Sequence, residues 1–204
     1  MRHASKILFA VLLALVPAAR AQEAPPPAAS LKGKFLVADP SMPDPRFAGT
    51  VIFMIAHSGD GALGVVVNRP RARRPLANVM RAFGIEPEPG QGESVEIELF
   101  WGGPVESNRV LLLHTDEFKA ESSVAVAPGV ALTMPKDALT AIAAGSGPKQ
   151  TLLAIGYAGW SAGQLERELE SKSWAVISGG PDLLFDADAA GMWDRAWKMR
   201  AQDL

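Results

Sequence analysis

Apolar residues gather in short runs rich in valine, isoleucine and leucine, and this pattern predicts β-strands along most of the chain. The runs cover residues 35–38, 50–56, 63–68, 95–101, 110–114, 151–157 and 174–178. Several of them are apolar at every position instead of at every second one, as in strands that are covered on both faces. We therefore expect a sheet with packed layers on both sides.

Three segments between these runs and one after them carry helix signals, and they cover residues 76–83, 135–144, 162–172 and 188–200. The first stops before Gly84, and the second begins with Pro135 and stops before Gly145, which are typical start and stop residues of helices. The last segment places Trp193 and Trp197 one turn apart, and we interpret these rings as core packing against the sheet.

The segment 162–172 has the clearest amphipathic pattern. Leu165 and Leu169 share one face of the predicted helix. Glu168 lies four residues before Lys172, which is the spacing of a helical ion pair.

Residues 59–64 (GDGALG) match the G-x-G-x-x-G fingerprint of dinucleotide-binding folds. In those folds the glycines open a helix, whereas three β-branched residues, Val65, Val66 and Val67, follow here and favour a strand. We therefore predict a β-hairpin with its turn at residues 58–61. The chain also has no cysteine, which removes thiolate chemistry and iron–sulfur clusters, and we expect no cofactor.

The first 21 residues have the three parts of a secretory signal: a basic start, an apolar run from Ile7 to Val16, and Ala19-Arg20-Ala21 before the expected cleavage. The apolar run is shorter than the roughly 20 residues of a membrane span, so we expect no transmembrane segment in the mature chain. Residues 22–30 (QEAPPPAAS) have the composition of an extended tether. These features predict one domain over residues 31–204, in the periplasm or outside the cell.

Removal of the leader changes the charge balance. It removes Arg2, Lys6 and Arg20 and no acidic residue, so 17 of the 20 basic residues remain against 22 acidic ones, a net charge of −5. A negative surface repels phosphate backbones, and we expect no direct binding of nucleic acid. The basic cluster within residues 69–75 contains two prolines and no aromatic residue, and we predict that it forms a solvated loop.

Residues 159–163 (GWSAG) match the nucleophile-elbow motif G-x-S-x-G between a predicted strand and a predicted helix. The two histidines after the leader, His57 and His114, both precede Ser161, whereas the histidine of an α/β-hydrolase triad follows its serine. Triads take other orders on other folds, so a serine hydrolase that uses Ser161 with His57 or His114 stays as an alternative. A capping box explains the same residues without catalysis, with Ser161 as N-cap and Gln164 three residues later.

The two histidines lie at predicted strand ends, without further ligands at the local spacing of a metal motif. We expect structural hydrogen bonds for both imidazoles and no metal site.

The stretch that contains Ser161 is also a family signal. Residues 156–169 (GYAGWSAGQLEREL) resemble the signature of the YqgE/AlgH family of bacterial proteins. The other matching segments follow in order: 31–38 (LKGKFLVA) with Pro40, Met42, Asp44 and Phe47; His57; 61–70 (GALGVVVNRP); 102–105 (GGPV); Leu113 and His114; Trp174; and Phe185 and Asp186. The resemblance extends from Leu31 to about Trp197.

This resemblance implies a single α/β domain with α+β character, in which a bifurcated mixed β-sheet wraps into a pseudo-barrel with flanking helices. It implies no activity, because the family is biochemically uncharacterised and its label of transcriptional regulator does not rest on a known DNA-binding motif. The family does not require serine at the position of Ser161, which argues against catalysis there. Members usually lack a leader, so a cytoplasmic transcriptional regulator is the alternative if residues 1–21 are not a signal.

Our hypothesis is a non-catalytic protein that binds a partner protein or a small ligand. The candidate binding residues are polar or aromatic residues at predicted loop edges: Asp39, Asp44, His57, Trp160, Gln164 and Glu166. Trp160 lies between glycine-rich neighbours at a sheet edge, where its ring would be partly exposed as an anchor for a ligand or would cover the end of the barrel.

Overall fold

The computed structural model describes residues 29–200, and the predicted leader and most of the predicted tether lie outside the described residues. Within residues 29–200, no helix combines the length and the apolar character needed to cross a membrane.

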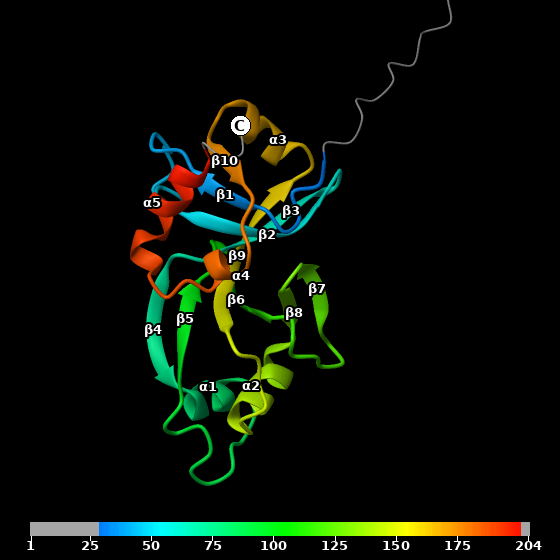
Figure 1. Cartoon of the computed structure of the whole chain (residues 1–204), viewed down its shortest axis with the longest axis vertical. Coiled ribbons are helices and arrows are strands. Elements are labelled where there is room, and N and C mark those ends of the chain that lie inside the picture. Colours follow the sequence, from blue (N-terminus) through cyan, green and yellow to red (C-terminus); the bar gives the residue numbers. More distant parts are fainter. Residues whose placement is uncertain (1–28, 201–204) are drawn as a thin grey trace, which may run out of the picture.

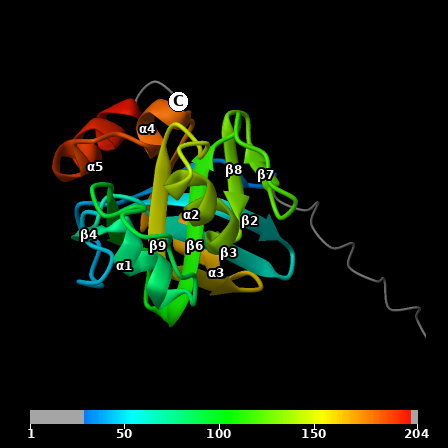
Figure 2. The ribbon, with the colours of Figure 1, turned by 90° about the horizontal axis from the view of Figure 1, so that it is seen from below.

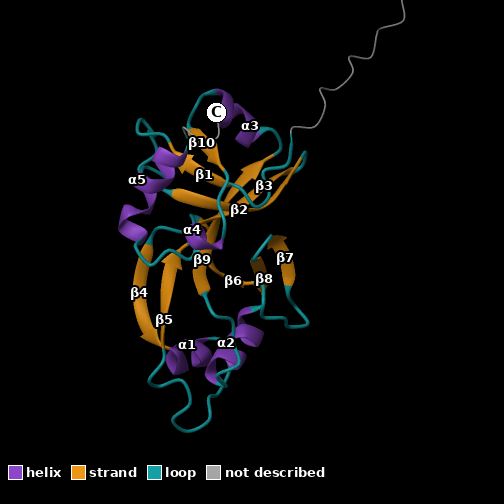
Figure 3. Cartoon of the chain, viewed as in Figure 1, coloured by secondary structure: helices purple, strands orange, loops and turns teal. Residues whose placement is uncertain are grey.

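In the described part of the chain, ten strands form one curled sheet and five helices pack around it (Figures 1 and 3). The strands are β1 Phe35–Ala38, β2 Val51–Ser58, β3 Gly61–Val66, β4 Pro70–Pro75, β5 Glu96–Trp101, β6 Val105–Thr115, β7 Val124–Ala127, β8 Val130–Thr133, β9 Thr151–Ser161 and β10 Trp174–Ile177. The helices are α1 Leu76–Ala82, α2 Pro135–Ala143, α3 Gln164–Glu170, α4 Pro181–Leu184 and α5 Ala189–Met199.

The sheet divides at its central strand, β9. The main order is β10-β1-β2-β3-β9-β6-β8-β7, and β4 joins through β5. The first half of β9 pairs in parallel with β5, the second half pairs antiparallel with β3, and β6 follows the other edge. The sheet is therefore mixed and bifurcated and curls into a half-barrel, which confirms the expected fold.

The chain passes from β5 to β6 directly across the backbone of β9. The two strands lie on opposite edges of β9, yet only residues 102–104 connect them. A Cβ at Gly103 would clash with the backbone of Tyr157, and one at Gly102 would clash with the carbonyl oxygen of Gly156. Glycine is required at this crossing because two backbones are in direct contact. This contact explains the glycines of two segments seen in the sequence, residues 102–105 (GGPV) and the start of residues 156–169 (GYAGWSAGQLEREL).

Alternate residues of the first three strands enter two separate cores. Phe35 and Val37 of β1 face a core that α5 covers, whereas Leu36 and Ala38 face a second core that Leu165 of α3 covers. The continuous apolar runs thus do form strands that are covered on both faces. Trp193 and Trp197 stack with an interplanar angle of 9° and pack against the first core, as predicted.

A third core lies at the other end of the molecule, where α1 and α2 pack on β5, β6 and β9. Figure 1 shows these two helices at the end opposite α3, and Figure 2 shows them from below, over β6 and β9.

Each of the seven predicted strands and four predicted helices corresponds to an observed element, and the turn of the predicted hairpin lies between Ser58 and Gly61. Strands β4, β7 and β8 and helix α4 were not predicted. The prediction of a solvated loop for the basic cluster was wrong, because residues 70–75 form β4 and pair antiparallel with β5. Its arginines and prolines are typical of an edge strand, where charge and missing N–H donors discourage further pairing.

Candidate functional site

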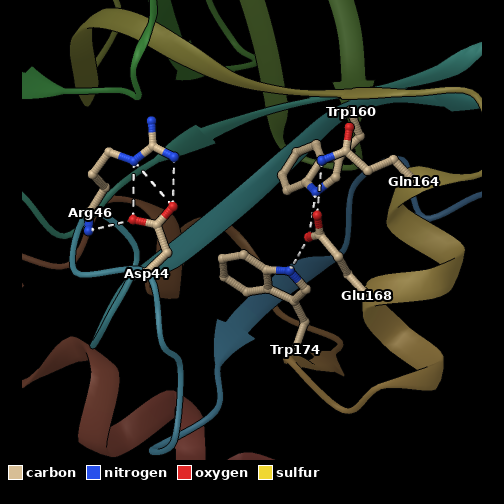
Figure 4. Close-up of polar contacts among 6 residues, drawn as sticks. All are labelled: Asp44, Arg46, Trp160, Gln164, Glu168 and Trp174. Carbon is tan, nitrogen blue, oxygen red and sulfur yellow. Dashed lines mark hydrogen bonds and ion pairs between the residues drawn. The ribbon is translucent and has the colours of Figure 1, made fainter.

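Two tryptophans and one carboxylate form the polar centre of the candidate site (Figure 4). Trp160 stands near the end of β9, Trp174 begins β10, and Glu168 lies on α3 between them in sequence. Both indole Nε1–H groups donate to Oε2 of Glu168, each at 2.8 Å. The side chain of Gln164, one turn earlier on α3, donates to Oε1 at 2.9 Å. Three donors thus fix this carboxylate and, through it, both rings.

A cavity of about 260 Å³ separates this cluster from the loop of residues 42–47, and we call it the tryptophan pocket. It is lined by Met42, Pro43, Asp44, Arg46, Phe47, Gly159, Trp160, Gln164, Glu168, Ser173 and Trp174. The Trp174 ring meets Trp160 and Phe47 edge to face, at centroid distances of 6.2 and 5.7 Å. Such geometry is favourable for aromatic pairs and gives the pocket rigid walls.

An ion pair forms the opposite rim of the pocket (Figure 4). Arg46 Nη2 donates to Asp44 Oδ2 at 2.6 Å, and its Nε donates to both carboxylate oxygens. Hydrogen bonds from the side chain and from the backbone N–H of Arg46 lower the pKa of Asp44, and the side-chain bonds have the larger effect. Because Asp44 and Arg46 compensate each other, the pocket lining has one net negative charge, which is that of Glu168.

His57 of β2 and Glu166 of α3 form a separate contact and do not line this pocket. His57 Nε2 lies 2.9 Å from Glu166 Oε1, and His57 Nδ1 accepts the backbone N–H of Leu31 at 3.0 Å. Because Nδ1 is an acceptor, the neutral ring carries its proton on Nε2 and donates it to Glu166. The backbone N–H of Glu166 itself and the bond from His57 lower the pKa of Glu166.

Asp39 also lies apart from the pocket. Its Oδ1 accepts the backbone N–H of Ser41 at 2.8 Å and the Ser41 hydroxyl at 2.6 Å. Both hydrogen bonds lower the pKa of Asp39, and the bond from the Ser41 hydroxyl has the larger effect. The geometry is that of an Asx turn that shapes the loop after β1.

The structure thus brings together three of the six candidate residues, Asp44, Trp160 and Gln164, in one pocket. Two members of that pocket with central roles, Glu168 and Trp174, were not among the candidates. Glu168 was expected to pair with Lys172, and this was wrong because its carboxylate accepts the two indoles instead. The partial exposure considered for Trp160 was also wrong, since only 7% of the residue is accessible.

Ser161 is the last residue of β9 and not the N-cap of α3. The helix begins at Gln164 after Gly163, which has a left-handed φ of 70° and is the N-cap residue. Only half of the predicted capping box is present, because the backbone N–H of Ser161 donates to Gln164 Oε1 at 3.1 Å and no side chain caps the helix.

The strand register separates Ser161 from His57. Ser161 pairs with Gly61, which pairs with Ser58, whereas Trp160 pairs with Ala62, which pairs with His57. Since paired residues share a face and successive residues alternate, Ser161 and His57 point to opposite faces of the sheet.

His114 is also not placed to act as a base for Ser161. It is fully buried on β6, with its ring nitrogens bonded to Thr133 Oγ1 at 2.6 Å and to the Thr115 carbonyl at 2.9 Å. Strands β2 and β6 are not neighbours, so the two histidines do not approach each other across paired strands. Among residues 29–200 no group of three histidine or acidic side chains is arranged to hold a metal ion.

The fold and these motifs agree with comparisons to known proteins. The model of the AlgH-like family matches residues 35–204. The chain belongs to the AlgH-like family. A UPF0301 protein of Rhodospirillum rubrum is 41% identical over 156 residues, which are 76% of this chain and 80% of that protein. A UPF0301 protein of Methylococcus capsulatus is 38% identical over 179 residues, 88% of this chain and 96% of that protein.

Solved structures show the same AlgH-like architecture. The solution structure of the AlgH protein from Pseudomonas aeruginosa is 35% identical, with a TM-score of 0.70 over 83% of this chain and 88% of that chain. A crystal structure of a protein from Corynebacterium diphtheriae shares the fold at 22% identity, with a TM-score of 0.63 over 81% of this chain and 84% of that one.

Proposed function

We propose that this AlgH-like chain is a non-catalytic binding protein and that the tryptophan pocket takes an organic cation from a small ligand or from a partner's side chain. The observation that carries the proposal is the position of Glu168, whose carboxylate is fixed on the pocket wall between two indole rings.

Preformed walls and net charge support this ligand class. Aromatic faces attract ammonium and guanidinium groups, and a carboxylate beside them adds to the attraction. Trp160 and Trp174 already have their indole N–H groups paired, so a ligand would not have to order these rings on binding. The Arg46 charge on the rim is offset by Asp44, which leaves the negative charge of Glu168 to select a cation.

The surroundings of the reactive groups support binding rather than turnover. A general base needs a free lone pair within reach of the substrate. The Nδ1 lone pair of His57 already accepts the backbone N–H of Leu31, and Nε2 is paired with Glu166, so this ring has no free lone pair. Ser161 points to the face opposite His57.

We further propose that the protein acts outside the cytoplasm. The sequence of residues 1–21 supports this, because it has the basic, apolar and small-residue parts of a secretory signal. Fractionation of the native cells together with the intact mass of the recovered protein tests it. Cleavage after Ala21 and recovery outside the cytoplasm are expected, whereas an uncleaved cytoplasmic chain would overturn export.

The binding proposal is tested by titrating tetramethylammonium while recording the indole N–H signals in a nitrogen–proton correlation spectrum. We expect the Trp160 and Trp174 signals to shift in a saturable way, with Trp193 and Trp197 as internal controls. Tert-butanol, a neutral molecule of similar shape, should cause much smaller shifts. Equal shifts with the neutral molecule, or none at Trp160 and Trp174, would refute the cation site.

Two variants on α3 assign the charge effect. Glu168→Gln keeps the shape of the side chain and removes its charge, and we expect at least a several-fold loss of tetramethylammonium affinity. Glu170→Gln removes an equal charge from an exposed position on the same helix and serves as the matched control. A loss of similar size in both variants would indicate general electrostatics and not a defined site.

A further inference from the structure

A second cavity, of about 530 Å³, is lined by residues of α1 and of the sheet. Helix α1 lies at the end of the molecule away from α3 (Figure 1). We call this cavity the α1 pocket. Seven apolar residues from α1 and its C-cap, β5, β6 and β9 line most of its surface: Val79, Ala82, Phe83, Leu99, Val110, Leu153 and Ile155. Apolar side chains that remain accessible in a cavity favour an apolar ligand, because each buried Å² of apolar surface contributes about 25 cal/mol.

Polar groups occur at only three positions of this lining, Arg74 on β4, Asn78 on α1 and Asn108 on β6, and all three residues are exposed. Arg74 is the only charged residue of the lining. Its Nη1 donates to the backbone carbonyl of Arg73, and no acidic side chain among residues 29–200 lies within ion-pair distance of its guanidinium.

The neighbouring arginine, Arg73, has an acidic partner that Arg74 lacks. Arg73 pairs with Glu98 at 3.2 Å, on the opposite face of β4. Arg74 and Ile97 share the other face with Ala72 and Leu99, and this face points toward α1. The strand thus places one compensated cation outside the pocket and one uncompensated cation at it.

We propose that the α1 pocket binds a single-chain amphiphile with an anionic head, a free aliphatic carboxylate, with its tail among the apolar residues and its carboxylate on Arg74. Arginine suits this head group because its fork of N–H donors matches the two oxygens of a carboxylate. The proposal is independent of the tryptophan pocket, with which the α1 pocket shares no lining residue.

The test is isothermal titration calorimetry of the purified protein with decanoate, at concentrations at which decanoate stays monomeric. Decanol keeps the tail without the charge, and decyltrimethylammonium reverses the charge. We expect one decanoate per chain, decanol about tenfold weaker, and decyltrimethylammonium weaker still. Equal affinity for the three molecules, or no decanoate binding, would overturn the proposal.

Three variants locate the two parts of the ligand. Arg74→Gln should weaken decanoate about tenfold, which corresponds to ~1.4 kcal/mol, and leave decanol unchanged. Arg73→Gln is the matched control and should leave both affinities unchanged. Ala82→Phe fills the pocket from an exposed helix position and should remove binding of both molecules, with the thermal transition confirming its fold.

A lipid surface also presents anionic head groups above acyl tails, and vesicles of phosphatidylglycerol, whose head group is a phosphodiester, separate this source from a free carboxylate. Cosedimentation with vesicles in the absence of decanoate binding would overturn the proposal of a free carboxylate. Decanoate binding that survives both Arg74→Gln and Ala82→Phe would place the ligand elsewhere and overturn it as well.

Discussion

His57 Nε2 on β2 lies 2.9 Å from Glu166 Oε1 on α3, and this contact connects the sheet to the helix that supplies Gln164 and Glu168 to the tryptophan pocket. The other ring nitrogen of His57 accepts the backbone N–H of Leu31, which ties the start of the described chain to the same pair. This arrangement accounts for a histidine at this position without any chemical role. It also makes Glu166 a group whose ionisation is linked to the stability of the fold.

We predict that the contribution of Glu166 to stability depends on pH. Its pKa is lower in the folded chain, so the ionised form stabilises the fold above the unfolded value of about 4.3, and this contribution is lost as pH falls through the folded pKa. Glu166→Gln should therefore lower the free energy of unfolding at pH 7, by less than ~1 kcal/mol because the side chain is partly exposed.

Urea denaturation of both proteins at several pH values between about 7 and 3 measures this effect. The difference between wild type and Glu166→Gln should shrink as the carboxylate is protonated. Glu170→Gln, on an exposed position of the same helix, should show no comparable difference at pH 7. A difference that stays constant over the whole range would show that the loss is one of packing.

Glu168 should be a much larger stabilising residue than its place on a surface helix suggests. In Glu168→Ala, the indole N–H groups of Trp160 and Trp174 lose their acceptor, and these residues are only 7% and 6% exposed. An unpaired buried donor costs about 1–3 kcal/mol, so we expect a loss of about 2–4 kcal/mol in the free energy of unfolding. Glu170→Ala should change it by less than about 0.5 kcal/mol, and equal effects of the two substitutions would contradict this role.

Gly103→Ala should disrupt the fold at the crossing of β9. The added Cβ would meet the backbone of Tyr157, which cannot move aside as the end of a side chain can, and the φ of Gly103 is 151°. We expect loss of soluble folded protein or a destabilisation of more than about 3 kcal/mol, measured by yield and thermal unfolding. Gly59→Ala lies in the β2–β3 turn with open space around it and should be close to neutral. Wild-type behaviour of Gly103→Ala would mean that the crossing tolerates a side chain.

The strands that were predicted from the sequence are those whose burial dominates their composition. Residues 35–38 are buried at every position, and the uninterrupted apolar run shows this. Residues 70–75 escaped prediction because β4 is an edge strand, and its composition, five polar or proline positions around Ala72, reflects solvent more than pairing. For β7 and β8 a usable signal was present, since Pro128 and Gly129 separate two apolar runs in residues 124–133.

The site was less predictable because its central contact depends on tertiary structure. From the sequence alone, Glu168 has Lys172 four residues later, and local spacing favours that pair. The partners that it takes instead, Trp160 and Trp174, come from strands on either side of α3, and only the paths of β9 and β10 bring them together. Trp160 was named as a candidate for its type and position, but its burial follows from the packing of α3.

The strand register also leads to a prediction about Ser161. A serine nucleophile needs a base that hydrogen-bonds its hydroxyl, and His57 lies on the other face of the sheet while His114 is buried on a strand that β3 and β9 separate from β2. A fluorophosphonate probe should therefore not label the folded protein at Ser161. Labelling of this serine that His57→Gln abolished would restore the hydrolase alternative, because it would require a conformation in which the two side chains reach the same face. Mass spectrometry of the intact and digested protein distinguishes these results. Ser161→Ala should leave both the thermal transition and tetramethylammonium binding unchanged, because the backbone N–H of Ser161, and not its hydroxyl, donates to Gln164.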